Sequence, residues 1–122
     1  MITLKNTIKV IVPTMDNDGK AIDYMAMIQE ATDVIGGSTM YDAKGLWIDN
    51  DTLYKDKSKM VEFNTTDKDT DLDAVLHLVS HIFVQGQQLA AWLQVNGTTY
   101  LIDMNDNLRD VRDTIENESM VK

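Results

Sequence analysis

The sequence has no cysteine among its 122 residues. This absence excludes disulfide bonds, thiolate metal sites and cysteine nucleophiles together. No apolar run approaches the roughly 20 residues that a membrane-spanning helix requires. The segment Met1–Lys5 also lacks the long apolar core of a secretory signal. We therefore expect a cytoplasmic protein without membrane contact.

Cations are scarce, with 11 Lys and Arg against 20 Asp and Glu, and the formal net charge is −9. A protein that binds nucleic acid generally needs a cationic surface that displaces counterions from the phosphates. Direct DNA binding is therefore not expected. The acidic surface has two interpretations, which are simple solubility or mimicry of nucleic acid toward a basic protein partner.

The familiar catalytic and metal-binding motifs are also missing. No glycine-rich phosphate loop, nucleophile elbow or dinucleotide fingerprint is present, and no pair of carboxylates is singled out as acid and base. Asp16–Gly19 begins like a calcium loop, but Met27 stands where the bidentate glutamate belongs. His77 and His81 have a spacing that permits a shared metal, yet no third ligand is suggested. We predict no catalytic residue, no metal site and no cofactor, and expect that the protein is not an enzyme.

What is present is typical of one globular domain spanning residues 1–122, with 43% hydrophobic and 25% charged residues. Turn residues and apolar periodicity predict six segments along the chain. These are a strand at Ile8–Val12, a helix at Lys20–Ile35 ended by Gly36–Gly37, a β-meander at 38–65, a helix that Gly86 closes, a hairpin at Leu89–Ile102 and a helix at Asp106–Ser119. The expected fold is α+β, an antiparallel sheet with two helices on one face (a ferredoxin-like variant) and a C-terminal helix.

Several details of these segments are specific enough to be tested. In the first helix, Ala21, Met25, Ile28 and Ile35 are expected on the buried face. In the meander, a turn containing Gly45 is expected between two short strands, Thr39–Tyr41 and Leu46–Ile48, and Met60–Asn64 forms a further strand. Asn96-Gly97 between two strand-like runs suits a type I′ turn.

Four alternating carboxylates precede the second helix, and they are Asp67, Asp69, Asp71 and Asp73. Carboxylates at a helix start face the positive end of the helix dipole and accept from free N–H groups. We interpret this run as a helix start and not as a metal site.

One stretch, Ala74–Ile102, contains no charged residue at all. His77, His81 and Val84 are expected on the outer side of the second helix, and Trp92 pairs with Leu101 on the outer side of the hairpin. The stretch is either deeply covered within one domain or part of a self-association surface. We favour self-association, because interface cores are depleted in charge and enriched in aromatic residues.

Two groups stand out among the few cations. Lys55, Lys57 and Lys59 alternate, so in an extended segment all three point to one side. Arg109 and Arg112 are the only arginines, and they are neighbours on the surface of the last helix. Either the arginines form intrahelical ion pairs, or the cations gather, in one subunit or across subunits, as a positive pocket for a phosphate-bearing anion.

Three segments, Ile8–Pro13, Gly36–Trp47 and Val95–Gly97, resemble a group of small phage proteins. The shared pattern is a strand ending in proline, a Gly-Gly-x-Thr segment leading to Gly-x-Trp, and a late hairpin. It is similar to the Thoeris anti-defence sponges of the first kind described. Those proteins sequester cyclic ADP-ribose signals made by bacterial TIR-domain proteins, and they assemble as dimers within hexamers. Some also hold cyclic oligonucleotides in a second pocket.

The resemblance implies a homo-oligomeric phage protein that binds a cyclic nucleotide in the infected bacterial cell without degrading it. The resemblance implies phosphate contacts, for which Arg109 is the best candidate and Lys57 the next, with Arg112 also included. It further implies aromatic stacking on the ligand by Phe83 or Trp92. Lys57 is a lysine where an arginine is expected. Two other functions remain open: an acidic inhibitor of a bacterial defence nuclease, similar to an anti-CRISPR protein, and a small enzyme that degrades a nucleotide signal.

Overall fold

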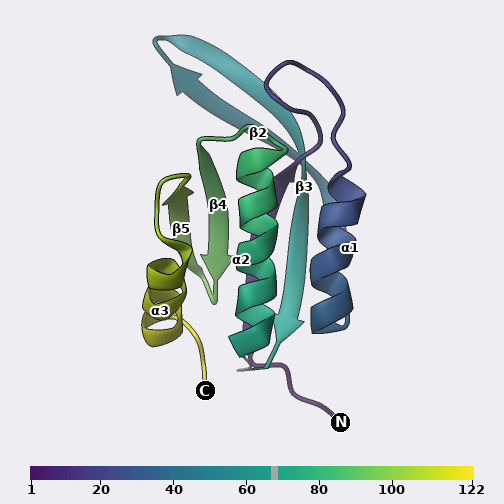
Figure 1. Cartoon of the computed structure of the whole chain (residues 1–122), viewed down its shortest axis with the longest axis vertical. Coiled ribbons are helices and arrows are strands. Elements are labelled where there is room, and N and C mark those ends of the chain that lie inside the picture. Colours follow the sequence, from purple (N-terminus) through teal and green to yellow (C-terminus); the bar gives the residue numbers. More distant parts are fainter. Residues whose placement is uncertain (67–68) are drawn as a thin grey trace.

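The computed structural model describes residues 1–66 and 69–122 and has the expected α+β architecture (Figure 1). Strands and helices follow one another in the order β-α-β-β-α-β-β-α. The elements are β1 Asn6–Pro13, α1 Tyr24–Ile35, β2 Thr39–Asp49, β3 Thr52–Thr65, α2 Asp69–Val84, β4 Ala90–Val95, β5 Thr98–Asp103 and α3 Leu108–Glu118. The predicted antiparallel sheet with two helices on one face and a C-terminal helix is confirmed.

The strands form one five-stranded antiparallel sheet in the order β2-β3-β1-β4-β5. Helices α1 and α2 run side by side across one face, and α3 lies beside β5 (Figure 1). The β2–β3 hairpin extends past the end of the sheet as a two-stranded ribbon. None of the helices that the structure describes is long and apolar enough to cross a membrane.

The core lies between the helix layer and the sheet, because side chains alternate between the two faces of each strand. In β1, Ile8, Val10 and Val12 are fully buried, and the residues between them are half-buried on the other face. Ile8 lies opposite Phe63 of β3 and Val95 of β4, so one apolar layer crosses the sheet. The helices complete it with Met27, Ile28, Ala31, Leu72, Val75, Leu76, Leu78, Val79, Ile82 and Ile115.

The first helix starts later than predicted, at Tyr24 and not at Lys20. The Asp16 carboxylate accepts the N–H groups of Asp18 and Lys20, both at 2.9 Å, and so closes a turn of its own. Asp23 caps the helix instead, accepting the N–H of Ala26 at 3.0 Å. The helix face is shifted accordingly, and Met25, predicted to be buried, is 47% exposed. The predicted end is confirmed by Gly36, which adopts the left-handed conformation at φ 108°.

The predicted turn containing Gly45 is wrong. Gly45 lies inside the continuous strand β2, opposite Asp56, and the chain reverses at Asn50 and Asp51, where φ is 51° and 62°. Positive φ at both central residues belongs to a type I′ turn, which asparagine and aspartate tolerate better than most residues. The expected meander is therefore one long hairpin, and the lysines of β3 share one face, as their alternation predicted.

The second helix begins at Asp69, and Asp69 and Asp71 lie in its first turn, as predicted for a helix start. Asp67 lies outside the described residues. Gly86 follows the helix end at a close approach of the chain, and Gln87, with φ 55°, takes the left-handed conformation after it. A side chain at position 86 would meet the carbonyl oxygen of Ile82.

The predicted hairpin around Asn96-Gly97 is confirmed, with φ of 50° and 88° at the two turn residues. The Asn96 side chain also ties the turn to its surroundings. Its amide donates to Asn6 Oδ1 at 2.8 Å and to the carbonyl oxygen of Ser119 at 2.7 Å. Asn6 in turn exchanges two hydrogen bonds with the backbone of Val121, at 2.9 and 2.7 Å. We name these four residues the asparagine clasp.

Candidate ligand-binding cleft

An open cleft of about 540 Å³ lies where β1 ends, α1 begins and the β2–β3 ribbon leaves the sheet. Its lining comes from the two long strands, from the segment after β1 and from the first turn of α1. Its lining residues are Thr14, Tyr24, Asp42, Ala43, Lys44, Lys57, Ser58 and Lys59. Because one aromatic ring, one carboxylate and three amines meet there, the cleft suits a small polar ligand with an aromatic part.

One wall of the cleft is a contact between Asp42, Lys59 and Tyr24. Asp42 and Lys59 are register partners on β2 and β3, and their side chains form an ion pair. The hydrogen bond that Lys59 donates holds the pKa of the Asp42 carboxyl below its usual range and raises the pKa of Lys59. The Lys59 ammonium also lies 5.6 Å from the centroid of the Tyr24 ring. The pairing brings a carboxylate, an amine and an aromatic face together.

Lys44 and Lys57 are also register partners, but they carry like charges. Neither has an ion-pair partner among residues 1–66 and 69–122. The backbone at Lys57 is held by the hydroxyl of Thr14, which donates to its carbonyl oxygen at 3.0 Å. Two adjacent uncompensated amines repel each other and favour an anionic group placed between them. This end of the cleft therefore suits a carboxylate or a phosphate.

The arginines predicted as ligand contacts lie elsewhere. Arg109 and Arg112 line a separate hollow of about 260 Å³ between α2 and α3. Arg112 forms ion pairs with Asp73 of α2 at 3.4 Å and with Asp113 at 3.5 Å. The hydrogen bond that Arg112 donates to Asp73 raises the pKa of the Arg112 guanidinium above its usual value. Within one subunit, Lys57 and the two arginines do not share a pocket, and Arg112 joins α3 to α2.

The aromatic residues predicted to stack on a ligand also lie outside the cleft. Phe83 is half-buried and packs against the core. Trp92 lies opposite Leu101 on the sheet face that carries no helix, which confirms the predicted pairing of these two residues. Of the predicted site residues, the structure therefore brings only Lys57 into the cleft. Tyr24 and Asp42 were not predicted, although the register of a β2–β3 hairpin would have placed Asp42 beside Lys59.

Solved structures with the same fold include a phage SAM lyase. Its complex with S-methyl-5′-thioadenosine superposes with a TM-score of 0.63 at 9% identity, covering 84% of this chain and 92% of the lyase. The lyase in its apo state gives a TM-score of 0.58 at 12% identity, with 88% and 98% covered. At these identities the likeness shows a common fold and assigns no residue its role.

A second neighbour is CutA from Synechococcus elongatus, with a TM-score of 0.50 at 10% identity over 90% of this chain and 88% of that one. No family model and no curated protein matches the chain. The likeness to these structures shows the fold, and neither the family models nor the curated proteins give a match to the sponge family.

The expectation that the protein is not an enzyme is contradicted by this comparison. The fold that the chain shares over most of its length is, in the phage neighbour, that of a lyase. The expectation depended on missing motifs. Such motifs mark catalytic groups that have a fixed spacing in sequence, whereas the side chains of this cleft come together only through strand register and the start of α1.

Proposed function

We propose that the protein is an enzyme that binds an adenosine-containing small molecule in the cleft and cleaves it, with S-adenosylmethionine as the first candidate substrate. The observation that carries the proposal is the joint placement of Tyr24, Asp42, Lys44 and Lys57 in one open cleft. The shared fold with a SAM lyase supports the reaction class.

The chemistry of this substrate explains why an enzyme that cleaves it can lack a catalytic acid–base pair. S-methyl-5′-thioadenosine, named as the ligand of the phage lyase, is S-adenosylmethionine without its amino-acid chain. The bond that breaks is the carbon–sulfur bond between the sulfonium and the amino-acid chain, and the bond that forms joins that carbon to an oxygen of the substrate's own carboxylate, so that the chain leaves as a lactone. Since a sulfonium leaves as a neutral thioether, no acid has to protonate the leaving group. Positioning and electrostatics can then supply most of the rate enhancement.

The cleft offers a partner for each part of such a substrate. The Tyr24 ring can stack on adenine, and the amines of Lys44 and Lys57 can hold the carboxylate. S-adenosylmethionine carries a net positive charge, so the net charge of −9 attracts it to the protein surface. Asp42, whose charge is partly compensated by Lys59, is the carboxylate of the cleft that could face the sulfonium or the ammonium.

A cyclic nucleotide such as a cyclic ADP-ribose isomer is the second candidate ligand. The two uncompensated lysines favour it, because two amines match a pyrophosphate better than a single carboxylate. A phage protein that removes such a signal would counter host defence. In this case the protein would also act on its ligand and not only hold it.

Incubation with each ligand, followed by heat denaturation and chromatography of the supernatant, tests both candidates. S-adenosylmethionine should be converted to S-methyl-5′-thioadenosine over many turnovers. Conversion of a cyclic nucleotide would select the second candidate. Recovery of every ligand intact would contradict the proposed function, and retention of none would favour an acidic inhibitor of a protein partner. Catalytically inert bovine serum albumin at the same concentration controls for spontaneous breakdown.

We also propose that the protein is a homo-oligomer. The ribbon beyond the sheet exposes Leu46, Ile48 and Leu53 on one side, with exposed fractions of 62%, 73% and 52%. On its other side Trp47 stacks on Tyr54 with ring centroids 4.5 Å apart. A two-stranded ribbon that exposes apolar side chains on both faces is marginal in water. A second copy of the chain that packs on the ribbon and on the helix-free sheet face would cover these side chains.

Trp92→Glu should dissociate this assembly, because it places a carboxylate in an apolar contact on the helix-free face. Light scattering at micromolar concentration measures the mass. Val84→Glu adds the same charge in the same uncharged stretch but on α2, where Val84 is 78% exposed, and should leave the mass unchanged. A monomeric mass for the wild-type protein would contradict the proposed homo-oligomer.

A further inference from the structure

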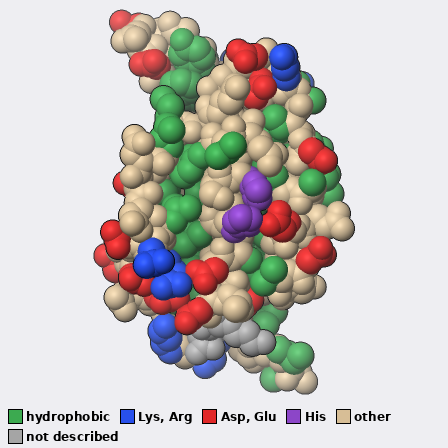
Figure 2. Space-filling view, viewed as in Figure 1, with side chains coloured by type: hydrophobic (Ala, Val, Ile, Leu, Met, Phe, Trp, Pro, Cys, Tyr) green, Lys and Arg blue, Asp and Glu red, His purple; other side chains and the backbone are tan. Residues whose placement is uncertain are grey.

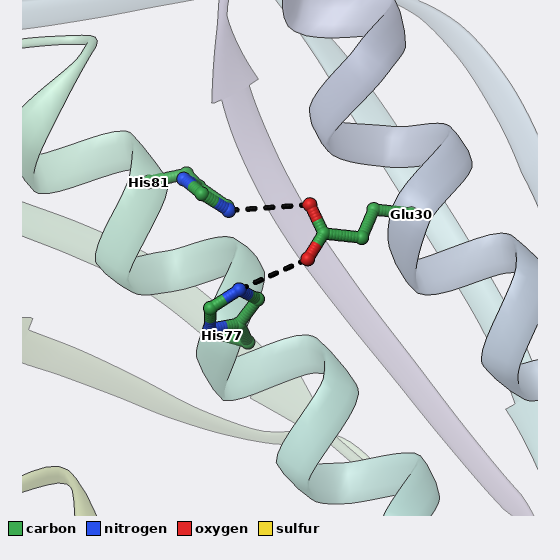
Figure 3. Close-up of side chains that lie close together, drawn as sticks. All are labelled: Glu30, His77 and His81. Atoms are coloured by element: carbon green, nitrogen blue, oxygen red, sulfur yellow. Dashed lines mark ion pairs between the residues drawn. The ribbon is translucent and has the colours of Figure 1, made fainter.

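A second cluster of polar side chains lies apart from the cleft, on the outer surface of α1 and α2. Glu30 of α1 projects between His77 and His81, which are one turn apart on α2 (Figure 3). Glu30 Oε1 is 2.9 Å from His77 Nε2, and Glu30 Oε2 is 3.3 Å from His81 Nε2. The carboxylate thus reaches two imidazoles at once. The α1–α2 pairing supplies the third group that the spacing of the histidines alone did not reveal.

The nitrogen of His81 that faces Glu30 is buried and unsatisfied. His81 Nε2 has no hydrogen-bond partner among residues 1–66 and 69–122, and its contact with Glu30 lacks hydrogen-bond geometry. On the other side of the ring, Nδ1 lies 3.2 Å from the amide nitrogen, Nε2, of Gln85. A half-turn of this amide would bring its oxygen to the ring, so that Nδ1–H donates to it and Nε2 of His81 keeps a free lone pair. That tautomer is the one a metal ligand requires.

The surroundings also suit a bound cation. A small hollow of about 40 Å³ lies beneath the three side chains, and its remaining walls are apolar, formed by Met27, Ala31, Val34, Ala74 and Leu78. An apolar shell lowers the local dielectric and strengthens binding to a charged centre. Above the hollow the cluster is open to solvent, with side-chain exposures of 59% for His77 and 53% for Glu30. Figure 2 shows the two histidines side by side on this surface.

We propose that Glu30, His77 and His81 form a binding site for a divalent transition-metal ion, zinc foremost. The possible ligand atoms of the three residues all lie within 4.8 Å of one another. A tetrahedral zinc site places its ligand atoms about 3.3 Å apart, given metal–ligand bonds of about 2.0–2.1 Å. Small rotations of the three side chains are therefore sufficient to close the site.

The donor set determines the class of metal. Two imidazoles and one carboxylate suit zinc and its first-row neighbours, whereas calcium and magnesium require oxygen ligands. Three protein ligands leave the fourth position to water or to an exchangeable ligand, the arrangement of a catalytic or sensory zinc site and not of a closed structural one. The bound ion would also fasten α1 to α2, on the layer opposite the helix-free sheet face.

Zinc titration of metal-free protein by calorimetry tests the site. We expect one zinc per chain and a raised melting temperature, with no such change for magnesium or calcium. Glu30→Gln keeps the shape but removes the anionic ligand, and His81→Ala removes an imidazole. Each should weaken zinc binding at least about tenfold. Gln85→Ala, which acts through His81, should weaken it by about tenfold, the lower end of the range for outer-shell partners.

Asp33→Asn is the matched control, because Asp33 is another exposed carboxylate on the same helix and lies outside the cluster. It should leave zinc affinity unchanged. Cobalt bound in place of zinc should give the visible absorption of a four-coordinate site, and His77→Ala should abolish it. Equal zinc binding by wild type and the His77→Ala, His81→Ala double variant would overturn the proposal. Absence of saturable binding by a wild type that melts cooperatively would do the same.

Discussion

Reversing the charge at position 57 is expected to weaken ligand binding in the cleft by about a hundredfold. Lys57→Glu removes one charge-assisted hydrogen bond, worth roughly 1.5–3 kcal/mol, and brings a carboxylate toward the ligand's own anionic group. At 1.4 kcal/mol per factor of ten, the loss of the hydrogen bond alone amounts to about ten- to a hundredfold. Calorimetry with the ligand that the conversion assay selects measures the effect.

Lys55→Glu is the matched control for this change. Lys55 lies on the same strand and the same face, two residues nearer the tip of the ribbon, and does not line the cleft. It alters the net charge equally, so it accounts for long-range attraction or repulsion of the ligand. Equal losses in the two variants would mean that Lys57 acts only through the overall field, and the cleft would not be the binding site.

Adding a methyl group at Gly86 is expected to lower the free energy of unfolding by about 1–3 kcal/mol, the usual cost of forcing extra volume into a packed site. A Cβ there would lie 2.6 Å from the carbonyl oxygen of Ile82 and 2.9 Å from Cγ of Pro13. The first contact is with backbone, so the end of α2 or the end of β1 has to move. Urea denaturation of Gly86→Ala followed by circular dichroism gives the value.

Gly37→Ala provides the comparison. A Cβ at Gly37 meets nothing within 4 Å, and its backbone does not have a positive φ. The substitution should therefore be neutral or should stabilise slightly, because it reduces the freedom of the unfolded chain. Equal stability of Gly86→Ala and Gly37→Ala would contradict the close approach of the end of α2 to the end of β1 at Gly86.

Features that depend on neighbouring residues could be predicted from the sequence. The Asn96-Gly97 turn, the alternating lysines and the helix end at Gly36 are each set by a few adjacent residues, and all three are confirmed. The fold class followed from the order of such segments. Gly45 misled the prediction because glycine marks turns more often than strand interiors, and only the pairing with Asp56 shows that β2 continues through it.

Most of the candidate site residues could not be predicted from the sequence, because tertiary structure brings them together. Glu30 is far along the chain from His77 and His81, and the packing of α1 on α2 decides that they meet. Tyr24 and Lys57 come together in the same way, at the junction of α1 with the ribbon. The sequence could show which residue types are scarce, such as the cations, but not which of them share a surface.

The asparagine clasp is a long-range set of hydrogen bonds that we expect to form late in folding. Its hydrogen bonds join Asn6, at the start of the central strand, to Val121 near the other end of the chain, 115 residues away. The central strand likewise pairs with β3 and β4, both distant in sequence, so the middle of the sheet depends on non-local contacts that form slowly. During synthesis the two hairpins can form as they emerge. Because the clasp needs both Asn6 and Val121, we expect it to form after both hairpins, as one of the last steps of folding.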